Sequence, residues 1–293
     1  MKSTVKLKEK HISPLQETPI RLQEYAVGIF STNPTKSGIK KAIKKGLVLV
    51  NGKVASTALY IVGGETIELY QEEIKATDKQ FIFPLEVVYE DDFLAVIFKP
   101  SGIVVSGNSF ATINNALEQN LKISSLKDAV IPRAVHRLDY PTSGLLLISK
   151  TNETTHYLSK LFEEKNISKT YHAITIGQMN NSGLIDIPVD EKESKSEFKV
   201  LQRIPSKKYK FLNLVELNPK TGRRHQLRKH LHGIGNPILG DKEYYIENLI
   251  SYGNGLYLHA TSLNFVHPST KEEMKFTKEL PKKFRRLFPN FSL

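Results

Sequence analysis

One aspartate stands out because of its neighbours. Asp139 lies in the segment 134–144, between Arg137 and an apolar run at 145–149 that is typical of a buried strand. A carboxylate in such a turn either forms a structural ion pair or acts as a nucleophile or base that a nearby cation keeps ionised. Asp139 is therefore a candidate catalytic residue, and the structural alternative stays open on this segment alone.

A second polar segment, 221–230, is rich in arginine and histidine and leads into 235–241. Arg224 and Arg228 are four residues apart, so they share one face of a helix that follows a glycine turn. Cations at the start of a helix oppose its dipole, and an anionic ligand would offset that cost. The segment is thus either an anion-binding helix or a basic helix on a solvated face.

Several other chemistries find little support in the sequence. The phosphate-binding loop and the dinucleotide-binding glycine fingerprint are both absent, so nothing indicates ATP or NAD chemistry. His225, His230 and His232 lack the His-Glu-x-x-His spacing of zinc helices, and neighbouring cations would repel a metal ion, so we expect no metal site. Ser143 lacks the flanking glycine of a nucleophile elbow, and we expect it to bind backbone in a turn. The absence of cysteine excludes disulfides and thiolate-held metal centres.

The composition indicates a globular protein with an anionic partner. Of 293 residues, 42 are Lys or Arg and 30 are Asp or Glu, which gives a net charge of +12. Such an excess attracts polyanions, most often nucleic acid, although anionic lipid or solubility also explains it. No apolar run is long enough for a membrane-spanning helix, and Met1 to Lys10 has no apolar core of a secretory signal behind it. We therefore expect a cytoplasmic protein.

The spacing of apolar residues predicts two domains. In chain order we expect a flexible arm at 1–19, a small α/β domain at 20–70, a linker at 71–83 and a larger domain at 84–293. The small domain contains a basic amphipathic helix over 36–45, and a β-hairpin follows over 47–54 with its turn at Asn51-Gly52.

Strands predominate in the larger domain and are mixed irregularly with helices. We expect strands at 85–90, 94–98, 145–149, 171–176, 211–217 and 256–260, and helices at 112–121, 152–165 and 225–233. Because strands and helices do not alternate strictly, the pattern favours an α+β domain with a mixed, largely antiparallel sheet over a doubly wound one.

The two polar segments together resemble two signatures of the RluA-type family of RNA pseudouridine synthases. The first signature is His136-Arg137-Leu138-Asp139 with Thr142-Ser143-Gly144, and the second runs from Thr221-Gly222-Arg223 through His225-Gln226-Leu227-Arg228 to Gly240-Asp241. Shorter matching blocks are Leu85 to Ser106 with Lys99-Pro100, Lys169 to Ala173, and Leu258 to Ala260. Because the blocks occur in order and without large gaps, the resemblance covers about 84–286.

The small domain, over 20–69, is similar to an S4 RNA-binding domain. Lys36 to Val54 carries the likeness, while 21–25 lacks the usual Asp-Arg pair and the helix has lysine where arginine is common. The resemblance implies that this domain binds RNA through Lys36, Lys40, Lys44 and Lys53.

The family resemblance implies an enzyme that isomerises uridine to pseudouridine in RNA without a cofactor. Asp139 would be the catalytic carboxylate, acting either at C1′ directly or through C2′, and Arg228 would pair with it. Tyr171 would stack on the flipped uracil and assist the removal of its C5 proton. The substrate-binding residues would be His136, Arg137, Thr142, Arg223, His225, Gln226 and Leu258, with Arg224 as a further phosphate contact.

Other interpretations remain open on the sequence. An inactive synthase-like protein would bind RNA without isomerising it, and a metal-dependent nuclease would use Asp91, Asp92 and the histidines at 225–232. The RNA target is expected to be ribosomal, because an S4-like domain leans that way, with transfer RNA as the alternative. We expect a monomer with no membrane partner.

Overall fold

The computed structural model separates the chain into two compact units, Met1–Lys79 and Gln80–Leu293. It describes residues 5–72, 81–251 and 253–291. Within these ranges, no helix is long and apolar enough to cross a membrane.

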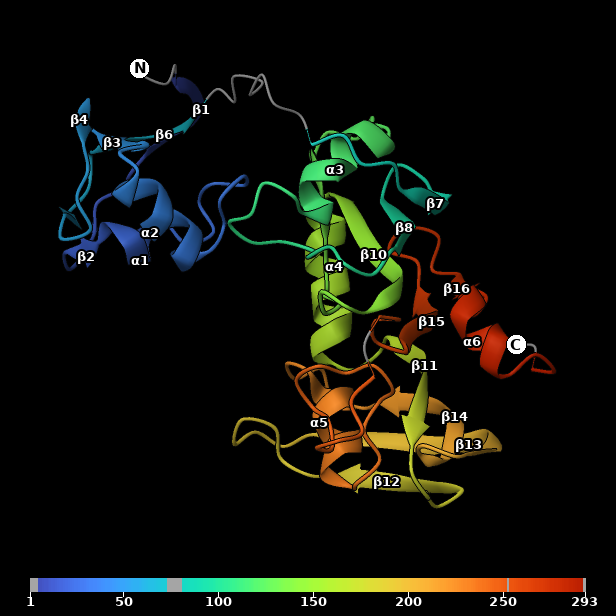
Figure 1. Ribbon diagram of the computed structural model, residues 1–293. Helices are drawn as coiled ribbons and strands as arrows, with labels where there is room; N and C mark the ends of the chain where they lie inside the picture. The colour runs from blue at the N-terminus through green and yellow to red at the C-terminus, as the bar shows by residue number, and fades with distance from the viewer. Residues whose placement is uncertain (1–4, 73–80, 252, 292–293) are drawn as a thin grey trace. The chain divides into compact units, whose positions relative to one another are not determined.

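The first unit is a small α/β domain (Figure 1). In chain order its elements are β1 (Val5–Ile12), β2 (Ile20–Arg21), α1 (Leu22–Tyr25), α2 (Lys36–Lys44), β3 (Val48–Val50), β4 (Lys53–Val54), β5 (Tyr60–Ile61) and β6 (Thr66–Glu72). Four strands form an antiparallel sheet in the order β1-β6-β3-β4, and β2 pairs with β5 separately. The unit has an apolar core of its own, made by the buried sides of the helices and strands.

The helix and hairpin predicted for the small domain are confirmed. Thr35 caps α2 by accepting the N–H of Gly38 at 3.1 Å, and Gly46, just beyond its end, has φ +71°. Asn51 and Gly52 join β3 to β4 with positive φ at both residues, as the tight hairpin turn requires.

The expectation of a flexible arm at 1–19 is wrong for residues 5–12, which form β1. This strand pairs antiparallel with β6 at the other end of the unit's sequence. The carboxylate of Glu9 accepts hydrogen bonds of 2.9 Å from the N–H groups of Ser31 and Thr32, ahead of α2. Because all these partners are distant in sequence, the local composition of the segment does not reveal the strand.

The predicted linker at 71–83 is also too long. Its first two residues end β6, and Phe81 and Phe83 belong to the second unit, where their rings stack with centroids 5.5 Å apart. The side chain of Asn120 donates to the Phe83 carbonyl at 2.8 Å and anchors this segment. The remaining part, 73–80, lies outside the described residues.

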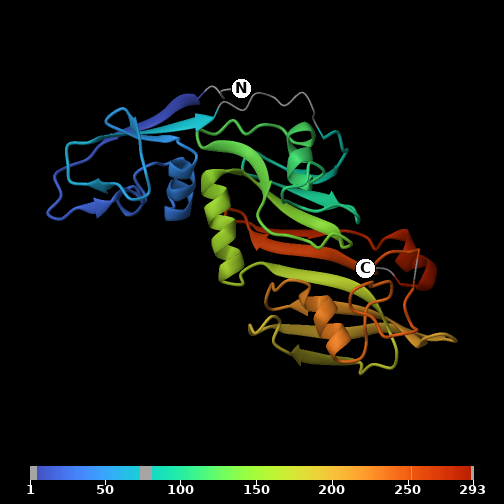
Figure 2. The ribbon, with the colours of Figure 1, turned by 60° about the vertical axis from the view of Figure 1, so that its left-hand side comes forward.

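The second unit is built on one large sheet (Figures 1 and 2). Its elements are β7 (Glu86–Glu90), β8 (Leu94–Lys99), α3 (Ile113–Asn120), β9 (Ala129–Ala134), β10 (Ser143–Thr151), α4 (Asn152–Glu163), β11 (Ser168–Ile176), β12 (Ser182–Asp186), β13 (Lys195–Ser206), β14 (Lys210–Pro219), α5 (Gln226–Gly233), β15 (Leu258–Val266), β16 (Glu273–Thr277) and α6 (Lys282–Leu287). The ten strands have the order β12-β13-β14-β11-β15-β10-β8-β7, with β9 beside β10 and β16 beside β15. Among these described strands β10 and β15 are parallel and the other pairs are antiparallel, which confirms the predicted α+β class.

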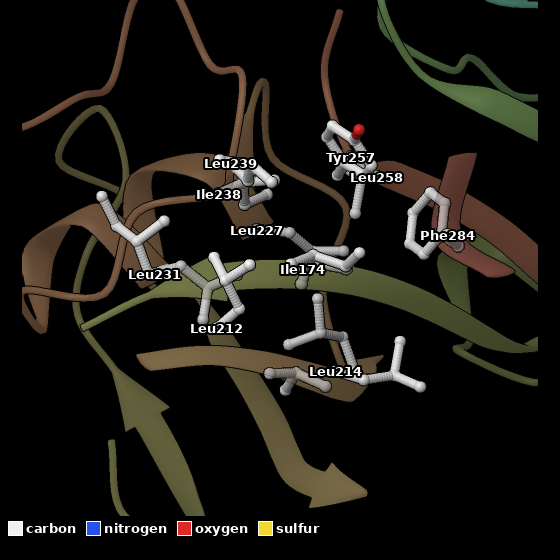
Figure 3. Packing of buried hydrophobic residues seen from close by; sticks show 14 of the residues in the cluster. Ile174, Leu212, Leu214, Leu227, Leu231, Ile238, Leu239, Tyr257, Leu258 and Phe284 are labelled. Atoms are coloured by element: carbon white, nitrogen blue, oxygen red, sulfur yellow. The ribbon is translucent and has the colours of Figure 1, made fainter. Parts of the chain in front are cut away.

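Helices cover the sheet on both faces of its central strands. Alternate side chains of β8 and β10 pack either with α3 or with α4, so these strands are buried on both sides. In the other half, Leu227 and Leu231 of α5 pack with Ile174 and Leu214 of β11 and β14, as Figure 3 shows. This packing fixes α5 against the sheet.

The parallel contact between β10 and β15 is very close. Gly144 pairs with Ala260, and a Cβ added to Gly144 would lie only 2.2 Å from the Ala260 carbonyl oxygen. Only glycine fits there, and its φ of +132° is one that other residues rarely adopt. The contact places the segment before β10, which contains Asp139, beside the start of β15.

Candidate active site

Asp139 lies in the turn that leads from β9 into β10. The N–H of Thr142 donates to the Asp139 carbonyl at 3.1 Å, and the N–H of Gly102 donates to the Tyr140 carbonyl at 2.8 Å. From β8, the ammonium of Lys99 donates to the carbonyl oxygens of Thr142 at 2.7 Å and of Asp139 at 3.2 Å. These contacts hold the backbone of the turn and leave the Asp139 carboxylate free to face its other neighbours.

Lys99 is a site residue that sequence reasoning did not single out. Its side chain is fully buried, and backbone carbonyl groups, including those of Pro100 and Tyr140, surround the ammonium. Burial lowers the pKa of Lys99 to about 8, and the negative charge of Asp139 opposes that shift. The available signal was a lysine that ends an apolar strand directly before a proline.

The turn before α5 is held by Gln226. Its Oε1 accepts hydrogen bonds from the hydroxyl of Thr221 at 2.7 Å and from the N–H of Arg223 at 3.0 Å. Its Nε2 donates to the Lys195 carbonyl at 3.0 Å and to Ser196 Oγ at 2.9 Å. Sequence reasoning placed Gln226 among the substrate-binding residues, whereas in the structure this buried amide fixes the loop on which the next residues stand.

His225 occupies the position just before α5 and has φ 55°, a left-handed conformation that is uncommon for a residue with a side chain. Its Nε2 lies 3.8 Å from Oδ1 of Asp139. Its Nδ1 lies 3.0 Å from the hydroxyl of Tyr244 and 3.3 Å from Oε2 of Glu243. The ring therefore connects the Asp139 carboxylate to two polar groups of the loop after Asp241.

Arg228 approaches the other oxygen of the same carboxylate. Its Nη1 lies 3.7 Å from Oδ2 of Asp139, and this buried nitrogen has no hydrogen-bond acceptor among the described residues. The Arg228 side chain is 2% exposed, whereas that of Asp139 is 26% exposed. A carboxylate that is open to solvent is thus flanked by a buried cation and an imidazole.

Asp241 determines the orientation of Arg228. Oδ2 of Asp241 accepts from Nε at 2.7 Å, and Oδ1 accepts from Nη2 at 2.7 Å, which is the two-pronged geometry of a strong ion pair. Glu243 lies 3.2 Å from Nη2, and the Tyr244 ring lies 4.9 Å from the guanidinium carbon. Burial lowers the pKa of Arg228, but the carboxylates of Asp241 and Glu243 raise it by more, so it stays charged. Sequence reasoning saw Asp241 only as part of a signature and missed this role.

Tyr171 and Leu258 come from the adjacent strands β11 and β15. Tyr171 pairs with Ala260 across the strands and packs against the apolar clusters on both sides of this region. Burial and the negative charge of Asp139 both raise the pKa of Tyr171, so its hydroxyl lies in the field of that carboxylate. Leu258 is only 4% exposed and packs into the core (Figure 3), which leaves little of it for a substrate.

The other predicted substrate-binding residues have different surroundings. His136 accepts the N–H of Leu147 at 3.0 Å through Nε2, and burial, with the charge of Lys169, lowers its pKa to about 3. The imidazole of His136 is therefore neutral and supports β10. Thr142 is buried, and its hydroxyl has no hydrogen-bond partner among the described residues.

Three arginines of the predicted site are exposed. The guanidinium of Arg137 forms no hydrogen bond or ion pair within the described chain, so it is available to an external anion. Arg223 donates from Nε to the Glu193 carbonyl at 3.2 Å. The hydrogen bond from Lys229 lowers the pKa of Asp190, and the charge of Arg224 adds to that shift. Arg223 and Arg224 thus bring positive charge to the turn before α5, and Arg137 brings it to the segment before Asp139.

The lysines proposed for the first unit are exposed on its surface. Lys36, Lys40 and Lys44 lie one turn apart along α2, and Lys36 forms an ion pair of 2.6 Å with Glu24. Lys53 stands in the hairpin strand β4.

Asp91 and Asp92, which a metal-dependent nuclease would use, are bound to other side chains of the second unit. Asp91 accepts hydrogen bonds from the Tyr89 hydroxyl at 2.8 Å and contacts Nε2 of His267 at 2.9 Å, while Asp92 accepts from Ser125 at 2.8 Å. In the part of the chain that the structure describes, no group of three or more His, Asp or Glu side chains is arranged to hold a metal ion.

Ser143 was expected in a turn, but it is the first residue of strand β10. It is buried at the start of β10, and its Oγ lies 2.9 Å from Nδ1 of His259. The close parallel contact of β10 with β15 brings His259 to this position.

The sequence of this chain is similar to those of known proteins. A family model described as RNA pseudouridylate synthase matches residues 93–233. An uncharacterized RNA pseudouridine synthase of Aquifex aeolicus is 34% identical over 87% of this chain and 88% of its own length. The chain belongs to the RluA-type family of RNA pseudouridine synthases. The protein is therefore an isomerase that acts on uridine in RNA.

Named relatives and a solved structure support the same assignment. Ribosomal large subunit pseudouridine synthase C of Rickettsia conorii is 30% identical over 92% of this chain and 97% of its own length. Ribosomal large subunit pseudouridine synthase D of Buchnera aphidicola is 33% identical over 84% of this chain and 86% of its own. The structure of human RNA pseudouridylate synthase domain containing 4 superposes with a TM-score of 0.56 at 28% identity, covering 68% of this chain and 90% of the human one. The superposition shows that this chain has a pseudouridine synthase fold.

Proposed function

We propose that this enzyme isomerises specific uridines of ribosomal RNA and that Asp139 is its catalytic carboxylate. The observation that carries the proposal is the position of Asp139, whose two oxygens face Arg228 at 3.7 Å and His225 at 3.8 Å. Arg228 places a buried positive charge beside this carboxylate. Relatives that are named as ribosomal large subunit synthases support the choice of RNA.

The proposed reaction needs no cofactor because it rearranges bonds within one nucleoside. The N1–C1′ bond breaks, the uracil turns, C5 bonds to C1′, and the C5 proton is replaced by one on N1. Asp139 engages the sugar, either at C1′ or through C2′, while the ring of Tyr171 stacks on the uracil. The partial exposure of Asp139 leaves the carboxylate accessible to a nucleotide that has left its stack.

A uridine in folded RNA must be flipped out, which costs a few kcal/mol. The exposed guanidinium groups around the site, those of Arg137, Arg223 and Arg224, suit contacts with phosphates beside the flipped nucleotide. We further propose that the first unit is an S4-like RNA-binding domain whose lysines at 40, 44 and 53 contact the backbone. The enzyme would act as a monomer in the cytoplasm.

Tritium release from RNA that carries 5-tritiated uridine tests the proposal. Wild type and Asp139→Asn are compared on unmodified ribosomal RNA and on transfer RNA, without added metal or nucleotide. We expect release by wild type from ribosomal RNA and none by the variant, with RNA binding and thermal stability unchanged. Normal turnover by Asp139→Asn would overturn the assignment of Asp139. Release from transfer RNA alone would change the substrate, and RNA binding without release from either would favour an inactive RNA-binding protein.

A further inference from the structure

The proposed reaction requires a base that removes the proton from C5 after C5 has bonded to C1′. This requirement rests on the proposed function, and it restricts where the base can lie. C1′ must approach Asp139, and C5 must come within bonding distance of C1′. The base therefore has to be a neighbour of the Asp139 carboxylate.

Three neighbours of this carboxylate are poorly suited to accept a proton. Arg228 stays charged because Asp241 and Glu243 surround its guanidinium. The ammonium of Lys99 points to backbone carbonyl groups. The raised pKa of Tyr171 disfavours the phenolate that a tyrosine base requires.

His225 has the geometry that the step needs. Its Nδ1 lies 3.3 Å from Oε2 of Glu243 and 3.0 Å from the Tyr244 hydroxyl. A carboxylate beside Nδ1 favours the tautomer with its proton on that nitrogen, which leaves the lone pair on Nε2. Nε2 in turn lies 3.8 Å from Oδ1 of Asp139, the carboxylate that is proposed to engage the sugar.

The backbone at His225 supports a functional role. A side-chain residue with φ 55° is held in a conformation of higher energy, and such residues are concentrated at active sites. The side chain of His225 is 13% exposed, so a proton that it accepts has a path to solvent. The buried amide of Gln226 fixes the turn that holds His225 in this conformation.

We propose that His225 is the base that accepts the C5 proton, with Glu243 orienting its ring. The C5–H bond breaks, its electron pair returns to the uracil ring, and the proton moves to Nε2. The imidazolium that forms has the carboxylates of Asp139 and Glu243 beside it, at 3.8 and 3.3 Å. It then releases its proton to water while N1 takes up one proton, so charge and atoms balance and no co-reactant is needed.

Two substitutions suit the unusual backbone of this position. Asn tolerates positive φ, and its amide lies where Nδ1 was, so His225→Asn keeps a donor near Glu243 and removes the basic Nε2. Gly also adopts positive φ freely, and His225→Gly leaves space for imidazole from solution. His232→Asn is the control, because this exposed histidine of α5 has its Nε2 at 3.2 Å from the Tyr245 carbonyl and its ring centroid at 6.4 Å from that of Tyr244, so the substitution removes an imidazole from α5 without touching His225.

The test measures single-turnover tritium release from 5-tritiated RNA, and the isotope effect with 5-deuterated uridine. We expect His225→Asn and His225→Gly to be slower by about 10²–10⁴-fold, the usual range for losing a general base. Both variants should show a larger isotope effect, and imidazole should accelerate only His225→Gly. His232→Asn should match wild type in every respect.

The outcomes separate this inference from the proposed function. If wild type releases tritium and His225→Asn is equally fast, the assignment of His225 is overturned while the isomerase stands. Slow release by both variants, without a larger isotope effect or a response to imidazole, would also overturn it and assign His225 to substrate binding. If wild type isomerises neither ribosomal nor transfer RNA, the proposed function fails and the inference fails with it.

Discussion

Arg228 binds Asp241 more closely than it binds Asp139. Two hydrogen bonds of 2.7 Å join its guanidinium to Asp241, whereas its Nη1 remains 3.7 Å from the Asp139 carboxylate. Asp241 is completely buried, and its Oδ1 also accepts the N–H groups of Glu243 and Tyr244 at 3.0 and 3.1 Å. Asp241 thus orders both the arginine and the loop that contacts His225, and leaves one guanidinium nitrogen directed at the proposed catalytic carboxylate.

The first prediction concerns this buried ion pair. Asp241→Asn removes the one fully buried carboxylate that pairs with Arg228, and breaking such a buried pair lowers the free energy of unfolding by about 3–5 kcal/mol. Urea unfolding measures the change. Glu243→Gln is the control: its side chain is 55% exposed, so we expect a loss of no more than about 1 kcal/mol. Equal effects of the two substitutions would show that Asp241 does not hold Arg228.

The second prediction separates the contribution of the Tyr171 hydroxyl from that of its aromatic ring. Because burial and Asp139 raise the pKa of Tyr171, its phenol stays protonated in the neutral range, and Tyr171→Phe removes only a hydrogen-bonding group. We expect single-turnover tritium release to fall by no more than about tenfold, the worth of one hydrogen bond. Tyr171→Ala also removes the stacking ring, and should be slower by about a further ten- to a hundredfold. A phenylalanine variant as slow as the alanine variant would contradict this division.

The third prediction is a loss of stability in mild acid. His172 and His259 pair across β11 and β15, and burial lowers the pKa of His172 to about 4 and that of His259 to about 3. An unfolded histidine binds a proton near pH 6.5, so below that pH the unfolded chain binds more protons than the native one. The free energy of unfolding should therefore fall as the pH falls from 6.5 towards about 4, by about 2 kcal/mol per histidine at pH 5.

Urea unfolding at pH 7 and pH 5 checks this dependence. Nδ1 of His172 lies 2.7 Å from Thr261 Oγ1, and Nδ1 of His259 lies 2.9 Å from Ser143 Oγ. The double substitution His172→Asn and His259→Asn keeps an amide near each of these positions. The double variant should show a smaller loss between the two pH values. The control His156→Asn, at an exposed histidine, should lose as much free energy of unfolding between pH 7 and pH 5 as wild type. An equal loss in wild type, the double variant and His156→Asn would refute the proposed role of His172 and His259 in the pH dependence.

The fourth prediction concerns the division of the chain. The apolar cores of Met1–Lys79 and Gln80–Leu293 share no residues, so the fragment 80–293 should fold. We expect it to keep the isomerisation chemistry but bind RNA more weakly, with a salt dependence reduced by about 0.7–0.9 in log–log slope for each phosphate that the fragment no longer neutralises. Filter binding at several salt concentrations measures this. Lys40→Gln with Lys44→Gln in the full chain should reproduce part of the effect, and a folded but inactive fragment would refute the division of labour.

Several features of this protein were readable from the sequence alone. The basic helix at α2 and the hairpin at 47–54 depend on local periodicity and on turn residues, and the structure contains both. The irregular order of strands and helices was enough for the α+β class, because it reflects which elements are neighbours in the chain. Asp139 and Arg228 were found as candidates because their residue types and blocks are local signals.

Only the tertiary structure decided how these residues meet. The contact of Asp139 with His225 and Arg228 depends on the register of β10 against β15 and on the packing of α5, which join segments far apart in sequence. The same holds for β1, whose partner β6 lies at the opposite end of its unit.

The roles of Lys99, Asp241 and Gln226 could not be predicted for the same physical reason. A buried charge or amide is stable only where partners satisfy it, and the partners here are backbone carbonyl groups, a distant guanidinium and the atoms of a neighbouring strand. Residue type shows which chemistry a side chain is capable of. Whether Gln226 binds a substrate or holds a loop is settled by what surrounds it after folding.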